Sequence, residues 1–359
     1  MIKLFEPHIS NDEIRATTSV LKSKFWASGS GINKVDDFEK SFTKYTGTKS
    51  TVAVNSGSAA LHLALSLFDI KNKEVLVPSL TFVSTVHSII QNGAKPVFVE
   101  VDPVTLCIDI NDIKKKISKK TGAIIPVHFG GMPANIKDLK ILSLEYKIPI
   151  IEDAAHACGS SFNNKKIGSH SDIVCFSFHP VKNLSMPVGG SICLNKNHLK
   201  FKKILNSKRW CGITNRNGFH YDVDKMGWNY YMNEISAAIG LVQLKKLNKL
   251  NKIRTNIAEK YFKKLNIENE SKMSFTKDCS YHLYWIRVKK RKEFMKKMES
   301  KGIQTGIHYS PVHSLTLYKK NSIKLPITEK IGREIVSIPI HPNLSEMDTD
   351  KIISTINNF

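Results

Sequence analysis

Residues 148–194 read IPIIEDAAHACGSSFNNKKIGSHSDIVCFSFHPVKNLSMPVGGSICL, with two apolar runs that are each followed by charged side chains. The first run ends at Glu152 and Asp153, and the second, over 173–178, leads to Lys182. A lysine amine can bind an aldehyde as an imine, and a carboxylate can keep a pyridine nitrogen protonated. The stretch therefore predicts a site for pyridoxal phosphate.

Short apolar runs alternate with helix-periodic segments through the first half of the chain. Such alternation predicts a mostly parallel sheet with helices on both faces, in which ligands bind at the carboxyl ends of the strands. Ser58, Phe82, Asp153 and Ser177 each come at or just after the end of an apolar, strand-like run. Glu152 should face away from Asp153, because neighbouring side chains of a strand point to opposite faces. The expected strands are 51–54, 75–77, 96–101, 123–127, 149–153 and 173–178, and the expected helices are 14–21, 35–45, a segment within 55–68, and 110–118.

Ser56, Gly57 and Ser58 stand where a strand turns into a helix. The first N–H groups of a helix have no partner inside it, so such a turn can bind an anion. Most Gly-Ser sequences at this position, however, only cap the helix and bind no ligand. In the company of Asp153 and Lys182, we assign Gly57 and Ser58 to the phosphate of the cofactor.

The rest of the chain predicts a second, smaller unit. Residues 206–227 are polar and lack periodicity, which is typical of a mobile loop over a site, and a turn is expected at 28–33. The pattern of predicted elements changes after residue 250, which predicts a large domain, 1–250, and a smaller C-terminal α/β domain, 251–359. The elements expected in this part are helices at 234–250, 253–265 and 292–300 and a strand at 281–288.

The composition is that of a globular protein with a large excess of basic residues. The 359 residues include 54 Lys and Arg against 31 Asp and Glu, a formal net charge of +23. Runs such as KKKISKK (114–120) could bind nucleic acid, but the chain lacks a recognition motif, and its lysines are interspersed with acidic residues. We therefore expect no nucleic-acid partner, although a basic surface would help to draw a phosphate-bearing substrate inward.

Targeting and metal-binding signals are not found in the sequence. The N-terminus, MIKLFEPHIS, has no apolar core, and no apolar run reaches membrane-spanning length, so we expect neither secretion nor membrane insertion. The six cysteines form no CxxC pair and several lie in predicted strands, which favours buried, reduced thiols in a cytoplasmic protein. The histidines are dispersed, so no metal site is expected.

Ordered motifs along the chain resemble those of the DegT/DnrJ/EryC1/StrS family of sugar aminotransferases. They are PSLTFVST (78–85), IIPVHFGG (124–131), EDAAHACG (152–159), FSFHPVKN (176–183) with the following GG, GWNYYMNEISAAIGLVQL (227–244) and GIHYSPVH (306–313). The resemblance covers nearly the whole chain. It implies the aspartate aminotransferase fold, pyridoxal phosphate as the cofactor, and a homodimer with two shared active sites.

The resemblance also implies roles for the residues around the cofactor ring. Lys182 would bind the cofactor as an imine and then act as the base that moves a proton during transfer. Asp153 would hold the proton on the pyridine nitrogen. Phe82 would stack on the ring and His156 would lie against it, although without the resemblance Phe82 would be taken as a core residue.

Phosphate and substrate contacts are implied in the same way. Ser177 corresponds to a hydroxyl on the phosphate, and Asn229 to a contact with the phosphate in the neighbouring subunit. Trp26, His308 and Tyr309 match segments near the substrate. For Trp26 a place in the core is equally compatible with the sequence.

Two further histidines lie near the predicted site. His179, between Ser177 and Lys182, would position the lysine or the substrate. His128 ends the strand expected at 123–127, where a structural role is at least as compatible as a functional one.

The chain departs from the family at two places. After Lys182-Asn183 the family usually has a sequence such as TTGEGG, whereas this chain has LSMPVGG, with Val188 in place of the glutamate. Tyr231 stands where the family usually has arginine. The loop and the contact made by that arginine can therefore differ here.

The function implied is transfer of an amino group from an amino acid, L-glutamate first, to a keto sugar. The expected acceptor is a nucleotide-linked 4-keto-6-deoxyhexose on a route to an amino sugar of a lipopolysaccharide or another polysaccharide. Sugar dehydratases related to this family use pyridoxamine phosphate and have histidine in place of the lysine, so Lys182 argues against them. A non-catalytic regulatory or nucleic-acid-binding protein is the other alternative, which the intact Lys182, Asp153 and Ser177 argue against.

Overall fold

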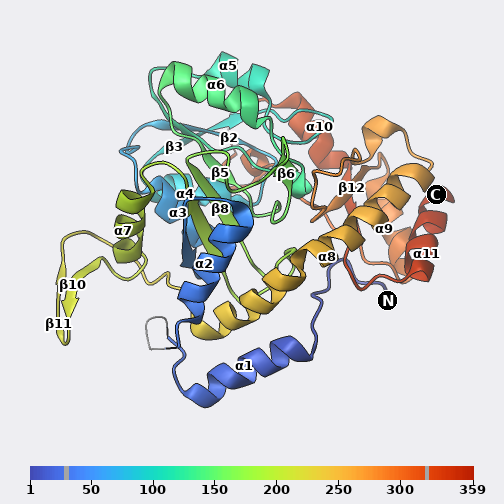
Figure 1. Cartoon of the computed structure of the whole chain (residues 1–359). Helices are drawn as coiled ribbons and strands as arrows, with labels where there is room; N and C mark the ends of the chain where they lie inside the picture. Colours follow the sequence, from blue (N-terminus) through green and yellow to red (C-terminus); the bar gives the residue numbers. More distant parts are fainter. Residues whose placement is uncertain (28–31, 320–322) are drawn as a thin grey trace.

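The computed structural model describes residues 1–27, 32–319 and 323–359, and Figure 1 shows its central sheet wrapped by helices. A group of four strands and a group of three are joined by parallel bridges between Ile124 and Ile150 and between Val127 and Asp153. β9 runs antiparallel to both of its neighbours, and the other pairings are parallel. The mostly parallel sheet predicted from the sequence is therefore confirmed. Its strands, in spatial order, are β1 (Ser50–Val54), β9 (Gly190–Leu194), β8 (Ile173–Ser177), β5 (Ile151–Asp153), β4 (Thr121–Ile124), β2 (Glu74–Pro78) and β3 (Lys95–Val99).

Helices cover both faces of the sheet because its strands are apolar on both sides. In β8, Ile173 and Cys175 pack against one layer of helices, while Val174 and Phe176 pack against the other. The first layer contains α3 (Gly57–Leu65), α4 (Val83–Gln91) and α7 (His198–Lys208). The second contains α2 (Lys34–Thr46), α5 (Ile110–Lys116), α6 (Ile136–Tyr146) and the first half of α8 (Glu234–Lys264).

A single long helix, α8, crosses the division expected at residue 250, where the sequence predicts two separate helices. No glycine or proline interrupts residues 250–253, and Asn251 is buried, with its side-chain amide donating to the Cys158 carbonyl at 3.0 Å. The helix therefore continues. It runs from the sheet to the C-terminal elements, and α1 (Asn11–Ser23) packs along it (Figure 1). The division into domains at 250/251 stays a prediction.

The C-terminal elements pack beside the sheet. β12 (Tyr284–Arg287) and β13 (Ile335–Ile338) form an antiparallel pair, which covers part of the expected strand 281–288. Their apolar side chains share one cluster with those of β2, β3 and α8. Around this pair lie α9 (Arg291–Ser300), α10 (Pro326–Glu334) and α11 (Glu346–Asn357).

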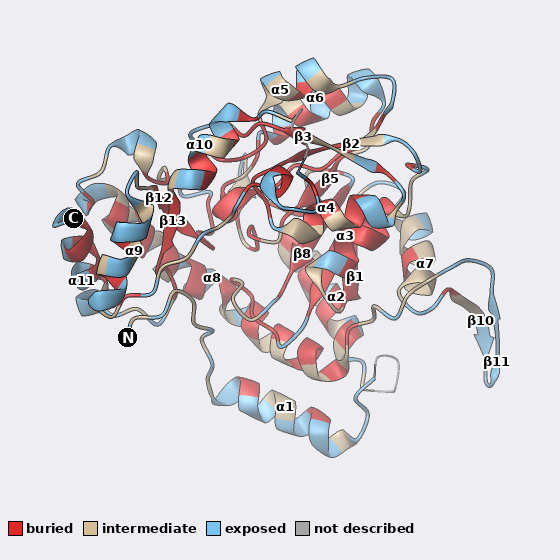
Figure 2. Ribbon diagram, turned by 180° about the vertical axis from the view of Figure 1, so that it is seen from behind, coloured by how far each residue is buried: buried red, intermediate tan, exposed pale blue. Residues whose placement is uncertain are grey.

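A projecting hairpin replaces much of the loop expected at 206–227. β10 (Ile213–Asn217) and β11 (His220–Val223) pair around a two-residue turn, in which Gly218 has a φ of +59°. Glycine at the first position of a two-residue turn favours it, because glycine adopts positive φ at little steric cost. The hairpin is almost wholly exposed and extends away from the body (Figure 2). We call it the arm.

Other expectations from the sequence can be compared directly with the structure. All six cysteines are free, and five of them are buried, with Cys211 exposed. Within the described ranges, every helix is too short or too polar to cross a bilayer. Of the turn expected at 28–33, residues 28–31 lie outside the described residues.

Candidate active site

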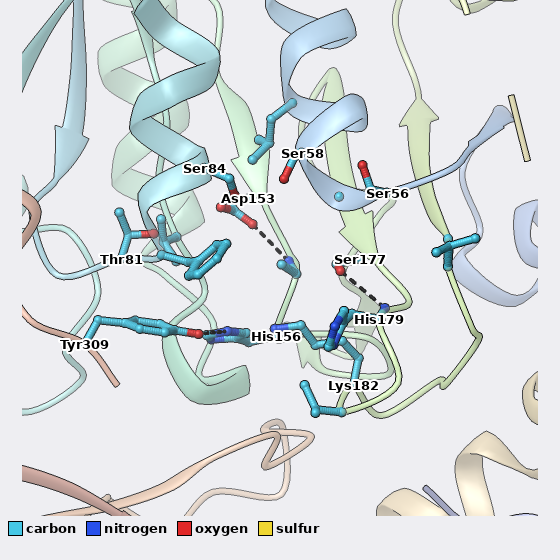
Figure 3. A pocket seen from close by; sticks show the side chains of 18 of the residues that line it. Ser56, Ser58, Thr81, Ser84, Asp153, His156, Ser177, His179, Lys182 and Tyr309 are labelled. Carbon is cyan, nitrogen blue, oxygen red and sulfur yellow. Dashed lines mark hydrogen bonds between the residues drawn. The ribbon is translucent and has the colours of Figure 1, made fainter. Parts of the chain in front are cut away.

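A pocket opens at the carboxyl ends of β5 and β8, beside the first turns of α3 and α4 (Figure 3). This is the edge of the sheet where the sequence predicts the site. Most of the predicted residues line the pocket, namely Gly57, Ser58, Phe82, Asp153, His156, Ser177, His179, Lys182, His308 and Tyr309.

Lys182 follows β8 in a tight turn, in which its backbone N–H donates to the His179 carbonyl at 2.8 Å. Its amine lies 3.4 Å from Nε2 of His282. Burial lowers the pKa of Lys182 to about 8, and the nearby charge of Asp153 opposes the decrease. An amine with this pKa loses its proton close to neutral pH, as a nucleophile or a base requires.

Asp153, the last residue of β5, is held by two neutral donors. Oδ2 accepts from the Thr85 hydroxyl at 2.8 Å, and Oδ1 accepts from the Ala155 N–H at 3.0 Å. Since the Thr85 hydroxyl donates to Asp153, its oxygen is left to accept from Thr81 at 2.9 Å. Burial raises the pKa of Asp153, and the hydrogen bonds from Thr85 and Ala155 act against it. The carboxylate is thus fixed in the pocket and able to bind a further proton donor.

The start of α3 forms a place for an anion. Ser56 caps the helix by accepting from the Ala59 N–H at 3.1 Å, which leaves the residues between them at the open end of the helix. Gly57 packs so closely on β8 that an added Cβ would lie 2.7 Å from Cβ of Ser177. The Ser58 side chain is exposed, and Figure 3 shows Ser56, Ser58 and Ser177 on one side of the pocket. Helix N–H groups and hydroxyls gathered in this way suit a phosphate.

Aromatic side chains form the opposite wall. Nδ1 of His156 accepts from the Gly130 N–H at 3.2 Å, so a neutral His156 carries its proton on Nε2, which lies 3.1 Å from the Tyr309 hydroxyl. Burial, with the Lys182 charge, holds the pKa of His156 well below its ordinary value. Burial also lowers the pKa of His308 to about 4. Phe82 lies at the mouth, with its ring centroid 5.8 Å from that of Tyr309.

Glu152 and His128 take a structural role instead. Glu152 points away from the pocket, as strand alternation predicts, and its Oε2 lies 2.8 Å from Nε2 of the fully buried His128. Nδ1 of His128 accepts from the Ala134 N–H at 3.0 Å, so Nε2 donates to the carboxylate. Burial acts to raise the pKa of Glu152, but this hydrogen bond holds it below its ordinary value.

Two predicted residues lie outside the pocket. The Trp26 indole N–H donates to the Leu21 carbonyl at 3.3 Å, and its side chain is half exposed, so Trp26 is not in the core. The Asn229 carbonyl accepts from the Asn55 side chain at 3.2 Å, and Asn55 itself lines the pocket. Asn229 therefore lies behind the phosphate end of the pocket in its own chain.

The structure also reveals functional candidates that sequence reasoning missed. Thr85, which holds Asp153, follows Phe82 by three residues in PSLTFVST and lies in the first turn of α4, and the hydroxyl of Thr81, just before the helix, lies 2.9 Å from its own. His282, which contacts Lys182, is one of thirteen histidines and lies in no motif that marks a site.

These residues fit pyridoxal phosphate. The pocket offers a buried amine for an aldehyde, a fixed carboxylate for a pyridine nitrogen, flanking aromatic groups for a ring, and an open helix end for a phosphate. Among the residues that line this pocket in the described structure, Lys182 is the single Lys or Arg side chain. The described ranges contain no cluster of three His, Cys, Asp or Glu side chains placed to hold a metal ion.

Comparisons with known proteins point to one family. The sequence pattern of the DegT/DnrJ/EryC1/StrS aminotransferase family matches residues 7–357. The uncharacterized protein MJ1066 of Methanocaldococcus jannaschii is 32% identical over 98% of this chain and 96% of its own length. Among solved structures, the putative sugar aminotransferase Spr1654 of Streptococcus pneumoniae is 28% identical, with a TM-score of 0.93 over 99% of this chain and 97% of its own in the apo form, and it has also been solved in a PMP form. PseC of Helicobacter pylori, an aminotransferase involved in the biosynthesis of pseudoaminic acid, is 26% identical, with a TM-score of 0.92 over the full length of both chains.

Proposed function

This chain belongs to the DegT/DnrJ/EryC1/StrS aminotransferase family, and we propose that it transfers an amino group from L-glutamate to a nucleotide-linked keto sugar. The acceptor we propose is a 4-keto-6-deoxyhexose, and the product an amino sugar for a lipopolysaccharide or another polysaccharide. The observation that carries the proposal is the buried Lys182 amine, with a pKa of about 8, in one pocket with Asp153. The five buried free thiols fit a reducing compartment, so we place the reaction in the cytoplasm.

Pyridoxal phosphate, when bound, supplies an aldehyde that carries the amino group between the two substrates and a ring that accepts electrons. Lys182 provides the amine that holds it and, when free and neutral, takes a proton from the α-carbon of the donor. Asp153, fixed by Thr85 and the Ala155 N–H, keeps the proton on the pyridine nitrogen. Phe82 and His156 flank the ring.

Phosphate binding falls to the open end of α3 and the end of β8. Gly57 and Ser58 offer backbone N–H groups and a hydroxyl, and Ser177 adds a second hydroxyl across the close contact with Gly57. The substrate then lies toward the mouth, where we assign its contacts to His179, His308 and Tyr309, all in the pocket wall. Trp26 stays a predicted substrate contact.

A second copy of the chain completes the site in this proposal. Lys182 is the single Lys or Arg side chain that lines the pocket in the described structure, whereas the proposed substrates carry several negative charges on carboxylate and diphosphate groups. The arm carries exposed apolar side chains, with Phe219 fully exposed and Tyr221 and Val223 largely so, and such groups are normally covered by a partner. We therefore propose a homodimer in which Asn229 and the arm of each subunit act on the pocket of the other.

The test is the visible absorbance of the purified protein loaded with pyridoxal phosphate, recorded before and after addition of L-glutamate. The wild type should show the band of a lysine-bound cofactor, and glutamate should abolish this band. Lys182→Ala should lack the band at every pH. Lys272→Ala is the control, because burial also lowers the pKa of Lys272, which donates to the Leu265 carbonyl outside the pocket, and this variant should behave as the wild type.

Candidate nucleotide-linked keto sugars are then added to the glutamate-treated protein. Return of the original band, with an aminated sugar in the mass spectrum, identifies the acceptor. A wild-type band that glutamate leaves unchanged would exclude the proposed donor, and a band retained in Lys182→Ala would exclude the proposed lysine.

A further inference from the structure

His282 lies in the loop before β12, buried at 1% exposure and held between two rings. Its ring stacks on Phe5, with centroids 5.5 Å apart and planes inclined by 16°, and the His156 centroid lies 4.5 Å away on the pocket side. This packing fixes the ring plane and directs Nε2 at the Lys182 amine, at 3.4 Å. Nδ1 has no hydrogen-bond partner within the described part of the chain.

Positively charged and neutral groups lie around this imidazole. Burial first, and then Lys182, His156, Arg254 and His308, act to lower the pKa of His282. A second charge beside a charged Lys182 is strongly disfavoured, so His282 is neutral and carries one proton. The two nitrogens of its ring are therefore different, one a donor and one an acceptor.

The protonation state of the neighbouring Lys182 amine determines which imidazole nitrogen of His282 carries the proton. In the cofactor-free protein near neutral pH, Lys182 is mostly an ammonium, which has three donors and no acceptor. Nε2, the nitrogen that faces it, must then be the acceptor, and the imidazole proton lies on Nδ1. The contact is thus a charge-assisted hydrogen bond from the ammonium to the imidazole.

We propose that His282 is a positioning residue for Lys182: the unprotonated Nε2 of His282 accepts a hydrogen bond from the Lys182 ammonium and fixes the position of the amine. The role of Lys182 itself rests on the proposed function. The lysine side chain is flexible, because four methylene groups separate its amine from the backbone. Asp153, the other charged group facing the amine, forms no hydrogen bond with it in the described structure. His282 is therefore the contact that fixes the amine, and it favours the protonated form.

Replacing His282 should change the titration of Lys182 in a defined direction. His282→Phe keeps a flat ring between Phe5 and His156 but removes the acceptor, so the pKa of Lys182 should fall by about one unit. The free-amine fraction at pH 7 would then rise roughly fivefold. In His282→Gln the side-chain carbonyl can accept from the ammonium in place of Nε2, so the wild-type pKa should be nearly restored.

The titration is measured on the cofactor-free protein by competitive acetylation with acetic anhydride across pH, followed by mass spectrometry of the peptide that contains Lys182. His87→Phe, a histidine on α4 outside the pocket, is the matched control and should titrate as the wild type. An unchanged pKa in His282→Phe, or equal shifts in the Phe and Gln variants, would overturn the proposal. His156, His179 and His308 also face Lys182 and are retained in every variant, so they do not account for a difference.

A measurement on the wild type covers the case in which His282→Phe fails to fold. Nitrogen-15 NMR of histidine-labelled, cofactor-free protein should show Nε2 of His282 unprotonated and Nδ1 protonated near neutral pH, with His282→Gln used for assignment. A proton on Nε2 would overturn the proposal. Neither measurement uses a substrate, so a failure here is distinct from a failure of the transaminase proposal, which the absorbance test decides.

Discussion

Gly57→Ala should weaken phosphate binding through a steric conflict that the structure locates. The added Cβ would lie 2.7 Å from Cβ and 3.3 Å from Cα of Ser177. Carbon atoms in ordinary contact are about 3.5 Å apart or more, so α3 and β8 would have to separate by about 0.8 Å. Overpacking of this kind costs about 1–3 kcal/mol, from which the better helix propensity of alanine recovers at most about 1 kcal/mol.

The effect on the cofactor should exceed the effect on stability. A shift of about 0.8 Å lengthens a hydrogen bond of about 2.9 Å beyond the range in which it is effective. Hydrogen bonds to charged groups contribute about 1.5–3 kcal/mol each, so losing one at the phosphate raises the dissociation constant by about 10- to 100-fold. The assay is fluorescence titration of the cofactor-free protein with pyridoxal phosphate, with urea unfolding measured in parallel.

Variants of Ser177 separate the steric cause from any other. In a Ser177→Gly background the opposing Cβ is gone, so Gly57→Ala should raise the dissociation constant far less than in the wild type. In a Ser177→Ala background that Cβ remains, and the full effect should persist. Equal effects of Gly57→Ala in the two backgrounds would refute the reasoning, as would a change of less than about threefold in the wild type.

Further expectations concern charge and assembly. The folded pKa of Asp153 is raised, so its ionised form costs stability, a cost that appears as pH rises above 3.8 and through the folded pKa. The urea midpoint of cofactor-free Asp153→Asn at neutral pH should thus equal or exceed that of the wild type, while fluorescence titration shows much weaker cofactor binding; a lower midpoint would contradict this. For Glu13, burial acts to raise the pKa, but the hydrogen bonds from Lys246 and Ser10 hold it at about 2. Its contribution relative to Glu13→Gln, about 1 kcal/mol once solvent screening is allowed for, should be complete above pH 4.5 and vanish toward pH 2 in urea unfolding; a difference independent of pH would count against the pairing. Phe219→Ser should weaken dimerisation roughly tenfold in sedimentation velocity, and an unchanged dimer would remove the arm from the interface.

Side chains that touch the reacting groups are predictable from the sequence because each follows an apolar strand. Asp153 ends β5 and Lys182 follows β8, and the parallel pairing of these strands brings both ends to one edge of the sheet. Alternation along β5 likewise separates Asp153 from Glu152. The ends of the apolar strands indicate the edge of the sheet at which the site lies, and the alternation of side chains indicates the face. The site therefore follows from the sequence once a parallel sheet is assumed.

Side chains that act through others are harder to predict, because their partners are distant in sequence. His282 meets Lys182 across 100 residues, and its orientation depends on Phe5 at the other end of the chain. No local pattern contains that information. Thr85 is the opposite case, since its spacing from Thr81 and Phe82 within the motif PSLTFVST was available in the sequence.

The arm and α8 differ from the prediction for local reasons that can be stated. An Asn-Gly pair at 217–218 is a hairpin signal, but without apolar alternation on either side it resembles an ordinary loop. Both strands of the arm are exposed, so their sequences lack the alternation of apolar and polar residues that is typical of a strand with one buried face. In α8 the helix end expected near residue 250 is wrong, because a change in sequence pattern does not end a helix, which requires glycine, proline or a cap.

The basic residues that give the chain its net charge of +23 lie mostly outside the pocket. Backbone hydrogen bonds place Lys73 beside Lys95, and Lys120 beside Glu74, at the amino ends of β2, β3 and β4. Parallel strands put this edge opposite the carboxyl ends, where the pocket opens with Lys182 as its single lining cation in the described structure. A basic edge on the far side can act on a phosphate-bearing substrate only through the long-range field, which salt screens over about 10 Å. Short-range charge for a diphosphate must therefore come from elements outside this pocket, and in the proposed dimer the arm of the second subunit can bring Arg216, whose guanidinium lies 5.0 Å from the Trp210 ring.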